Sequence, residues 1–306
     1  MVMMEVKLET RRFRRYATEG HDRAINVVRL DPFVLFMGIA EDRHCPNPIT
    51  ICPTFVMTPF MVLPILLARP RKGNSMNTLI TPRVAETLNA LHQEAETVDR
   101  AHIAARMAEI TEAGESFAEA VPRWLGEERA AYRTIYHDYA GNFLSVSETY
   151  GRFLYMIART CWAKRIVEFG TSMGISTIYL AAALRDNGGG QLISSEIEPA
   201  KAARARANLE ATGLADLVEI REGDALDTLK HVGGEVDLVL LDGAFSLYLP
   251  VLKLIEPHLM RGATILGENA FDPSYLDYVR DPANLYFSQP LPVGEGRGNE
   301  FTVRAS

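Results

Sequence analysis

The stretch from Arg165 to Leu180 constrains the fold of this chain more than any other part of its sequence. A short apolar run, residues 165–169, stops at Gly170, and apolar residues at helical spacing begin directly after Gly174. This order predicts a β-strand, a tight glycine turn and the N-terminus of a helix, whose free backbone N–H groups can hold a nucleotide-like ligand. The chain is therefore expected to contain an α/β domain with a ligand site at this turn.

The glycine spacing within the turn narrows the class of ligand. The sequence reads Glu168-x-Gly170-x-x-x-Gly174 and lacks the Gly-x-Gly-x-x-Gly pattern of dinucleotide-binding enzymes. The missing second glycine is the one that lets backbone approach a pyrophosphate. A ligand without phosphates therefore fits better, and S-adenosylmethionine is the predicted one, whereas an NAD-dependent dehydrogenase is disfavoured.

After Arg165 the chain alternates strongly apolar segments with amphipathic ones. Strands are predicted at residues 165–169, 191–196, 217–221, 236–242 and 262–267, and helices at 175–185, 199–212, 225–231, 247–258 and 273–280. This alternation is typical of a mostly parallel sheet covered by helices on both faces. Two further strand-like segments, 285–291 and 300–304, have no helix between them, so they predict a terminal hairpin that adds an antiparallel strand.

A helical region is predicted ahead of this domain. Thr81-Pro82 is a plausible N-cap followed by proline at the first helical position, and helical spacing returns over residues 117–139, with interruptions expected near Pro122 and Gly126. The tyrosines on one face of that second helix (Tyr132, Tyr136 and Tyr139) either pack against the main domain or form a lid over an aromatic pocket. We assign residues 76–144 to this helical region and residues 145–306 to the main domain.

The first 75 residues show no sustained period and are expected to form a poorly structured extension. Residues 48–68 have about the length of a membrane span, but three prolines would break such a helix repeatedly. A second hypothesis is that translation starts at Met76 in a bacterial cell, because Lys72-Gly73-Asn74 back-translates to a purine-rich ribosome-binding sequence. An intact peptide from residues 1–70 in the native protein would contradict this hypothesis.

The composition limits partners and compartment. The chain has 306 residues and a net charge of −7, and its acidic excess lies after residue 75, which argues against nonspecific binding to nucleic acid. Its three cysteines cannot form a disulfide framework, so a reducing cytoplasm is the expected compartment. We expect a small-molecule acceptor as partner, no membrane association, and a homodimer as one plausible assembly.

Polar residues follow each predicted strand of the main domain, where an open α/β sheet binds its ligands. The first turn, with Gly170, Ser172, Gly174 and Ser176, suits the carboxylate of an amino acid, and Glu168 suits its ammonium group. Glu196 is placed to accept hydrogen bonds from two ribose hydroxyls, and the backbone of Asp224 and Ala225 suits an adenine amino group. An alternative for Asp224 is that it only caps the following helix.

Five motifs in this part of the chain resemble those of one enzyme family. They are Glu-Phe-Gly-Thr-Ser-Met-Gly-Ile-Ser (168–176), Ile-Ser-Ser-Glu-Ile-Glu-Pro (193–199), Glu-Gly-Asp-Ala (222–225), Leu-Leu-Asp-Gly (240–243) and Glu-Asn-Ala (268–270). Residues 145–306 are similar to the class I S-adenosylmethionine-dependent O-methyltransferases of the catechol/caffeoyl-CoA type, including bacterial members. The resemblance implies a Rossmann-like seven-stranded sheet of order 3-2-1-4-5-7-6 and the cofactor roles given above, with Asp242 facing both cofactor and metal.

A divalent metal site is predicted where two neighbouring strands end. Strands lie about 4.8 Å apart, so Asp242, Glu268 and Asn269 can converge on one ion such as Mg²⁺. In the family the second pair is typically Asp-Asn, and the longer Glu268 displaces the carboxylate. The alternative is that Asp242 serves only the cofactor and Glu268 makes a structural hydrogen bond.

The family's general base is missing from this chain. Members usually carry Asp-x-x-Lys-x-x-Tyr, whereas here Phe245 stands at the lysine position between Asp242 and Tyr248. A neutral phenol with a pKa of about 10 attacks poorly, so a group must accept its proton or a metal must lower its pKa. A metal-bound catecholate, a base supplied by Tyr248, His137 or the substrate, and a slow enzyme or different acceptor all stay open.

The leading hypothesis is a methyltransferase that acts on a hydroxyl of a small, aromatic, catechol-like acceptor, with Asp242 and Tyr248 as catalytic residues. One rival is a metal-independent N- or O-methyltransferase. A rival of another class is a cofactor-binding protein with little turnover, which the Phe245 substitution suggests.

Overall fold

The computed structural model describes residues 26–30, 33–37, 77–293 and 298–305. The chain divides into two compact units, Met1–Arg69 and Pro70–Ser306. In the first unit β1 (Asn26–Leu30) pairs antiparallel with β2 (Phe33–Met37), a hairpin that the predicted unstructured extension did not include. The rest of that prediction, and the proposed start at Met76, lie outside the described residues.

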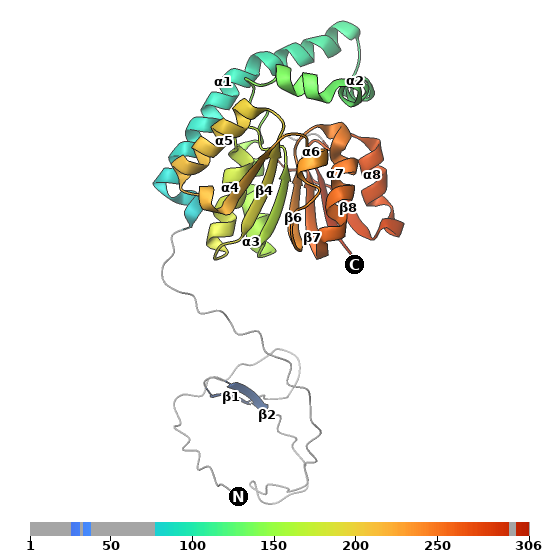
Figure 1. Ribbon diagram of the computed structural model, residues 1–306. Helices are drawn as coiled ribbons and strands as arrows, with labels where there is room; N and C mark the ends of the chain where they lie inside the picture. Colours follow the sequence, from blue (N-terminus) through green and yellow to red (C-terminus); the bar gives the residue numbers. More distant parts are fainter. Residues whose placement is uncertain (1–25, 31–32, 38–76, 294–297, 306) are drawn as a thin grey trace, which may run out of the picture. The chain divides into compact units, whose positions relative to one another are not determined.

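The second unit is built on a seven-stranded sheet of order β5-β4-β3-β6-β7-β9-β8 (Figure 1). The strands are β3 (Arg165–Phe169), β4 (Gln191–Glu196), β5 (Val218–Glu222), β6 (Val236–Leu241), β7 (Leu259–Gly267), β8 (Tyr286–Pro290) and β9 (Glu300–Arg304). The first five run parallel, and β9 pairs antiparallel with both β7 and β8. Numbered within the sheet this order is 3-2-1-4-5-7-6, so the predicted fold and its terminal hairpin are confirmed.

Helices cover both faces of the sheet, as the apolar strands require. One face packs on α3 (Glu148–Thr160), α4 (Ile175–Asp186) and α5 (Pro199–Thr212), and the other on α6 (Ala225–Thr228), α7 (Tyr248–Ile255) and α8 (Pro273–Arg280). Alternate residues of one strand enter different cores, since Leu238 and Leu240 of β6 join the first and Val239 and Leu241 the second. Both faces are therefore buried, which explains why β6 reads as a continuous apolar run.

Several element ends differ from the predicted ones. Strand β7 begins at Leu259, three residues before its predicted start, and α6 ends at Thr228. Helix α7 ends at Ile255 and continues as a 3₁₀ turn, Glu256–His258, because Pro257 has no N–H to donate to an α-helical hydrogen bond. None of these shifts moves a strand end that faces the ligand site.

The helical region consists of α1 (Pro82–Ala113) and α2 (Phe117–Asp138). Thr81 is the N-cap of α1, as predicted, and a capping box between Ser116 and Glu119 starts α2. The predicted interruptions near Pro122 and Gly126 are wrong, because the helix runs through both and its backbone departs from helical angles at Ala131. Residues 77–144 belong to the same compact unit as the sheet. No helix among the described residues combines the length and apolarity needed to cross a membrane.

Candidate functional site

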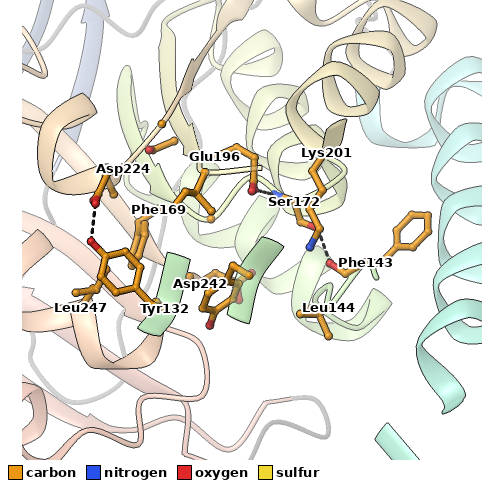
Figure 2. Close-up of a pocket in the computed structure, with 18 residues that line it drawn as sticks. Tyr132, Phe143, Leu144, Phe169, Ser172, Glu196, Lys201, Asp224, Asp242 and Leu247 are labelled. Atoms are coloured by element: carbon orange, nitrogen blue, oxygen red, sulfur yellow. Dashed lines mark hydrogen bonds between the residues drawn. The ribbon is translucent and has the colours of Figure 1, made fainter. Parts of the chain in front are cut away.

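A cavity opens at the carboxyl ends of β3, β4, β5 and β6, beneath α2 (Figure 2). Six of the residues predicted from the sequence to bind a cofactor line it, namely Gly170, Ser172, Glu196, Asp224, Ala225 and Asp242. The topology explains this convergence, since parallel strands bring their carboxyl ends to one edge of the sheet. The structure therefore assembles most of the predicted site from segments up to seventy residues apart.

Glu196 lies at the end of β4 with its carboxylate held by backbone. Oε2 accepts a hydrogen bond from the N–H of Ser172 (2.6 Å) and Oε1 accepts one from the N–H of Glu198 (2.9 Å). Burial raises the pKa of the Glu196 carboxyl, while these two backbone donors oppose that rise. Each carboxylate oxygen retains a lone pair, so the fixed carboxylate can still accept hydrogen bonds from two ligand hydroxyls.

The carboxylate of Asp224 is already occupied by protein donors. It caps α6 by accepting the N–H of Leu226 (2.9 Å), and it also accepts the hydroxyl of Tyr132 (2.5 Å) and the guanidinium of Arg133. The side chain of Asp224 therefore caps α6, as the alternative prediction for this residue stated. Ala225 follows it in the cavity wall, so both residues of this turn line the cavity.

Glu168, Gly174 and Ser176 do not line the cavity. Glu168 is fully buried and accepts hydrogen bonds from the hydroxyls of Ser176, Thr177 and Ser194, each at 2.6 Å. Gly174 caps α4 at a φ of 88° and faces α5. These three residues support the glycine turn from behind, so of the motif 168–176 only Phe169, Gly170 and Ser172 line the cavity wall.

The hydroxyl cluster predicts a pH dependence of stability. Burial raises the pKa of Glu168 to about 7 from 4.5, so the charge it acquires above pH 4.5 is disfavoured in the folded chain. The contribution of Glu168 to the free energy of unfolding is therefore present at pH 4.5 and is lost as pH rises through 7. The free energy of unfolding falls by roughly 3 kcal/mol over this range. Urea unfolding should show that Glu168→Gln is most destabilising at pH 5 and least at pH 8. A difference from the wild-type protein that stays constant with pH would contradict this assignment.

Asp242 and Glu268 form a half-buried carboxyl pair at the carboxyl ends of β6 and β7, with Asp242 in the cavity wall. Their side chains are hydrogen-bonded to each other, and the amide of Asn269 donates to Glu268. Burial, and then repulsion by Glu268 and Glu168, raises the pKa of Asp242 well above its usual value, and burial raises that of Glu268 to about 7. Two carboxyl groups this close cannot both ionise easily, so the pair shares a proton at neutral pH.

The predicted metal ligands therefore lie together, as two carboxyl groups and one amide. No group of three or more His, Cys, Asp or Glu side chains among the described residues is placed to hold a metal ion.

Tyr248 and Phe245 pack beside this pair in an aromatic cluster. The Tyr248 hydroxyl donates to the backbone carbonyl of Glu268 (2.6 Å), the side chain is fully buried, and burial raises its pKa well above the usual value. Phe245 packs edge-to-face on Phe271, with ring centroids 5.5 Å apart, and Phe271 packs likewise on Phe117. Tyr248 is thus held as a structural donor, and the ring of Phe245 stands at the position where the resemblance predicts a lysine.

Helix α2 covers the cavity and is tied to the main domain by several polar contacts, two of which involve cavity residues. Tyr132 and Tyr136 line the cavity, and Tyr132 also binds Asp224. Another contact is made by buried Glu128, which accepts the N–H of Ser246 (2.6 Å) and the hydroxyl of Tyr136 (2.9 Å). Tyr139 instead packs on His102, and His137 contacts Glu198 outside the cavity.

Phe143, Leu144 and Lys201 are among the cavity residues that were not predicted from the sequence. Phe143 and Leu144 are held by Asp99 of α1, which accepts the backbone N–H of each (2.9 and 2.7 Å). Lys201 belongs to the first turn of α5, in a run of small and basic residues that reads as a solvated helix face. The position of Lys201 in the sequence does not predict that it is buried, because its inward direction depends on how α5 packs on the neighbouring loop.

Comparisons with known proteins agree with this geometry. Residues 167–270 match a protein family described as a methyltransferase domain. A catechol O-methyltransferase from Niastella koreensis is 35% identical over 43% of this chain and 65% of its own length, and one from Mycobacterium tuberculosis is 37% identical over 41% of this chain and 57% of its own length. The chain thus spans less than two thirds of these curated relatives.

Among solved structures, the cofactor-bound protein Rv0187 from MTB is similar with a TM-score of 0.51 and 26% identity, covering 66% of this chain and 97% of that one. The family match, residues 167–270, spans the strand ends that form the cavity. Residues 167–270 are therefore similar to a methyltransferase domain, and the curated relatives that match this chain include catechol O-methyltransferases.

Proposed function

We propose that this protein is an S-adenosylmethionine-dependent O-methyltransferase that methylates a hydroxyl of a small aromatic, catechol-like compound. The observation that carries this proposal is the cavity that joins Glu196, the Gly170 turn and Asp242 at the carboxyl edge of one sheet. The names of the curated relatives, catechol O-methyltransferase, support the acceptor class.

The cofactor's parts match different sections of the cavity wall. Glu196, with a free lone pair on each oxygen, accepts the two ribose hydroxyls. The turn at Asp224 and Ala225 offers backbone to the adenine amino group, and the Gly170–Ser172 turn receives the amino-acid end. This arrangement directs the sulfonium and its methyl group toward Asp242.

The acceptor then binds beyond Asp242, against the aromatic cluster of Phe245, Phe271 and Tyr248. Methyl transfer is an in-line displacement at carbon, so holding the acceptor oxygen behind the methyl group supplies much of the rate. Aromatic rings that present edges and faces favour a flat aromatic acceptor. Tyr132 and Tyr136 of α2 close the cavity from above, and we propose that α2 acts as its lid.

The donor set of Asp242, Glu268 and Asn269 fits a hard divalent cation. The carboxyl groups of Asp242 and Glu268 share one proton, and a divalent ion can replace that proton and be bound by their oxygens. The amide of Asn269 can rotate so that its oxygen also faces the ion. When bound there, Mg²⁺ would lower the pKa of an acceptor hydroxyl. If no ion binds, the same carboxyl pair is the nearest group able to accept the acceptor's proton, since its raised pKa makes it a stronger base.

Two measurements test the proposed function. Titration calorimetry should detect binding of S-adenosylhomocysteine, and absence of binding at millimolar ligand would refute the cofactor assignment. Methyl transfer to a panel of catechols, with and without a chelator, then separates a metal-dependent enzyme from a metal-independent one. Tight cofactor binding without transfer to any oxygen or nitrogen acceptor would favour a low-turnover binding protein instead.

Restoring the family's lysine gives a direct test of the missing base. Phe245→Lys is expected to raise the rate of catechol methylation by about tenfold or more, because a positioned base contributes at least this much. Phe245→Leu is the matched control, since it removes the ring without adding an amine and should leave the rate unchanged or lower. Equal rates for the lysine and leucine variants would show that position 245 does not take part in proton transfer.

A further inference from the structure

Lys201 is a buried cation in the cavity wall. Its side chain is only 4% exposed, yet it lines the cavity, and Figure 2 shows it extending from α5 toward Ser172 and Phe143. Among the residues that the structure describes, no hydrogen bond or ion pair reaches its ammonium group. Its ammonium faces the cavity, where the desolvation of a cation is costly unless a ligand supplies a partner.

The packing of α5 explains why this lysine points inward. Residues 201, 205 and 208 share one face of the helix, which lies against the loop after β3. Ala205 sits against Gly174, and the amide of Asn208 donates to the carbonyl of Met173 (2.8 Å). One turn earlier, the same face places Lys201 over Ser172, at the beginning of the glycine turn.

The charges around Lys201 leave it without a committed partner. Burial lowers the pKa of its ammonium, while Glu196, Asp99 and Glu198 raise it from a distance. Glu196 is bound by two backbone N–H groups, and Asp99 is bound by the segment 142–144. The carboxylates that oppose the effect of burial on Lys201 are therefore themselves engaged elsewhere.

Only one group of the proposed cofactor complements this cation. Lys201 is the sole basic residue among the described residues that line the cavity, whereas Glu196, Asp224 and Asp242 are acidic. S-adenosylmethionine carries a sulfonium, an ammonium and a single anionic group, its α-carboxylate. Glu168 and Ser176, which the sequence assigned to the amino-acid end, are closed within the hydroxyl cluster.

We propose that Lys201 binds the α-carboxylate of the cofactor, a role that rests on the proposed function. The ammonium pairs with the carboxylate beside Ser172, while Glu196 holds the ribose hydroxyls. The lysine thereby fixes the amino-acid end of the cofactor and offsets the acidic character of the rest of the cavity.

The test compares two ligands on the full-length protein and on Lys201→Met. Calorimetry with S-adenosylhomocysteine should show a loss of affinity of about 10- to 100-fold in the variant, the range of a charged hydrogen bond. The decarboxylated analogue, S-adenosyl-3-thiopropylamine, keeps the ribose, adenine and amine, so its affinity should change less than about threefold. Lys230→Met, which removes an exposed lysine paired with Asp227, is the control and should bind both ligands as the wild-type protein does.

Three results would overturn the inference. An equal loss for both ligands would assign Lys201 to the ribose, and no loss for either would remove it from the site. If Lys201→Met clearly loses affinity and Lys201→Arg restores it for neither ligand, the positive charge at this position is not what binds the cofactor. Failure of the wild-type protein to bind S-adenosylhomocysteine would instead refute the proposed function. Methionine has a similar length and removes an unpaired buried charge, so the variant is expected to fold, which circular dichroism checks.

Discussion

Gly170→Ala is expected to abolish cofactor binding and to lower the free energy of unfolding by about 3 kcal/mol. A Cβ atom at residue 170 would lie 2.1 Å from the carbonyl oxygen of Asp242, and the φ of 100° is already unfavourable for alanine. The atoms that the new Cβ would meet are main-chain atoms of residues 242 and 243, so no flexible side chain can move to relieve the clash. Urea unfolding and calorimetry with S-adenosylhomocysteine would measure the two effects.

Gly262 provides the matched control for Gly170. Its φ is 81°, but a Cβ there would meet nothing within 4 Å. Gly262→Ala therefore carries the backbone cost alone, about 1 kcal/mol, and should leave ligand binding intact. If Gly170→Ala proved no more destabilising than Gly262→Ala and bound the ligand normally, the close approach of β3 and β6 would not be what shapes the site.

Asp242→Asn should reduce methyl transfer by at least about 100-fold without loss of stability. The lower bound is that expected for a positioned acid–base group. The carboxyl of Asp242 lines the cavity and is paired with Glu268, so its loss removes the acidic pair whether that pair holds an ion or accepts a proton. Asparagine also relieves the repulsion between the two carboxyl groups, so the melting temperature should stay constant or rise. Steady-state rates and thermal unfolding of the same samples test both statements.

Asp237 is the corresponding control on the same strand. It lies at the opposite end of β6, where its carboxylate accepts the backbone N–H groups of Lys164 and Arg165 (2.7 and 2.8 Å). Asp237→Asn should leave the rate of methyl transfer near that of the wild-type protein. Comparable loss of activity in both variants, or full activity of Asp242→Asn, would remove Asp242 from the reaction.

The strand-end residues show how far local pattern reaches. Glu196, Asp224 and Asp242 were predicted as one site because each follows an apolar run, and parallel strands end at a common edge. Period and burial are properties of neighbouring residues, so the strands and the convergence of their ends could be predicted, whereas the sheet order came from the resemblance to a known family. The extent of α2 was less predictable, because Pro122 lies within it while the actual distortion falls at Ala131, where no sequence signal occurs.

The sequence by itself determined the α/β fold, the glycine turn and the edge of the sheet at which ligands bind. Only the tertiary structure decided which way each side chain points. It closed Glu168 into a cluster of three hydroxyls, tied the Tyr248 hydroxyl to the Glu268 carbonyl, and turned Lys201 into the cavity. The partners of Glu168 and Tyr248 lie 8 to 26 residues away in sequence, and the position of Lys201 depends on packing between α5 and the loop after β3. Hydrophobic spacing does not show which of these polar groups will meet.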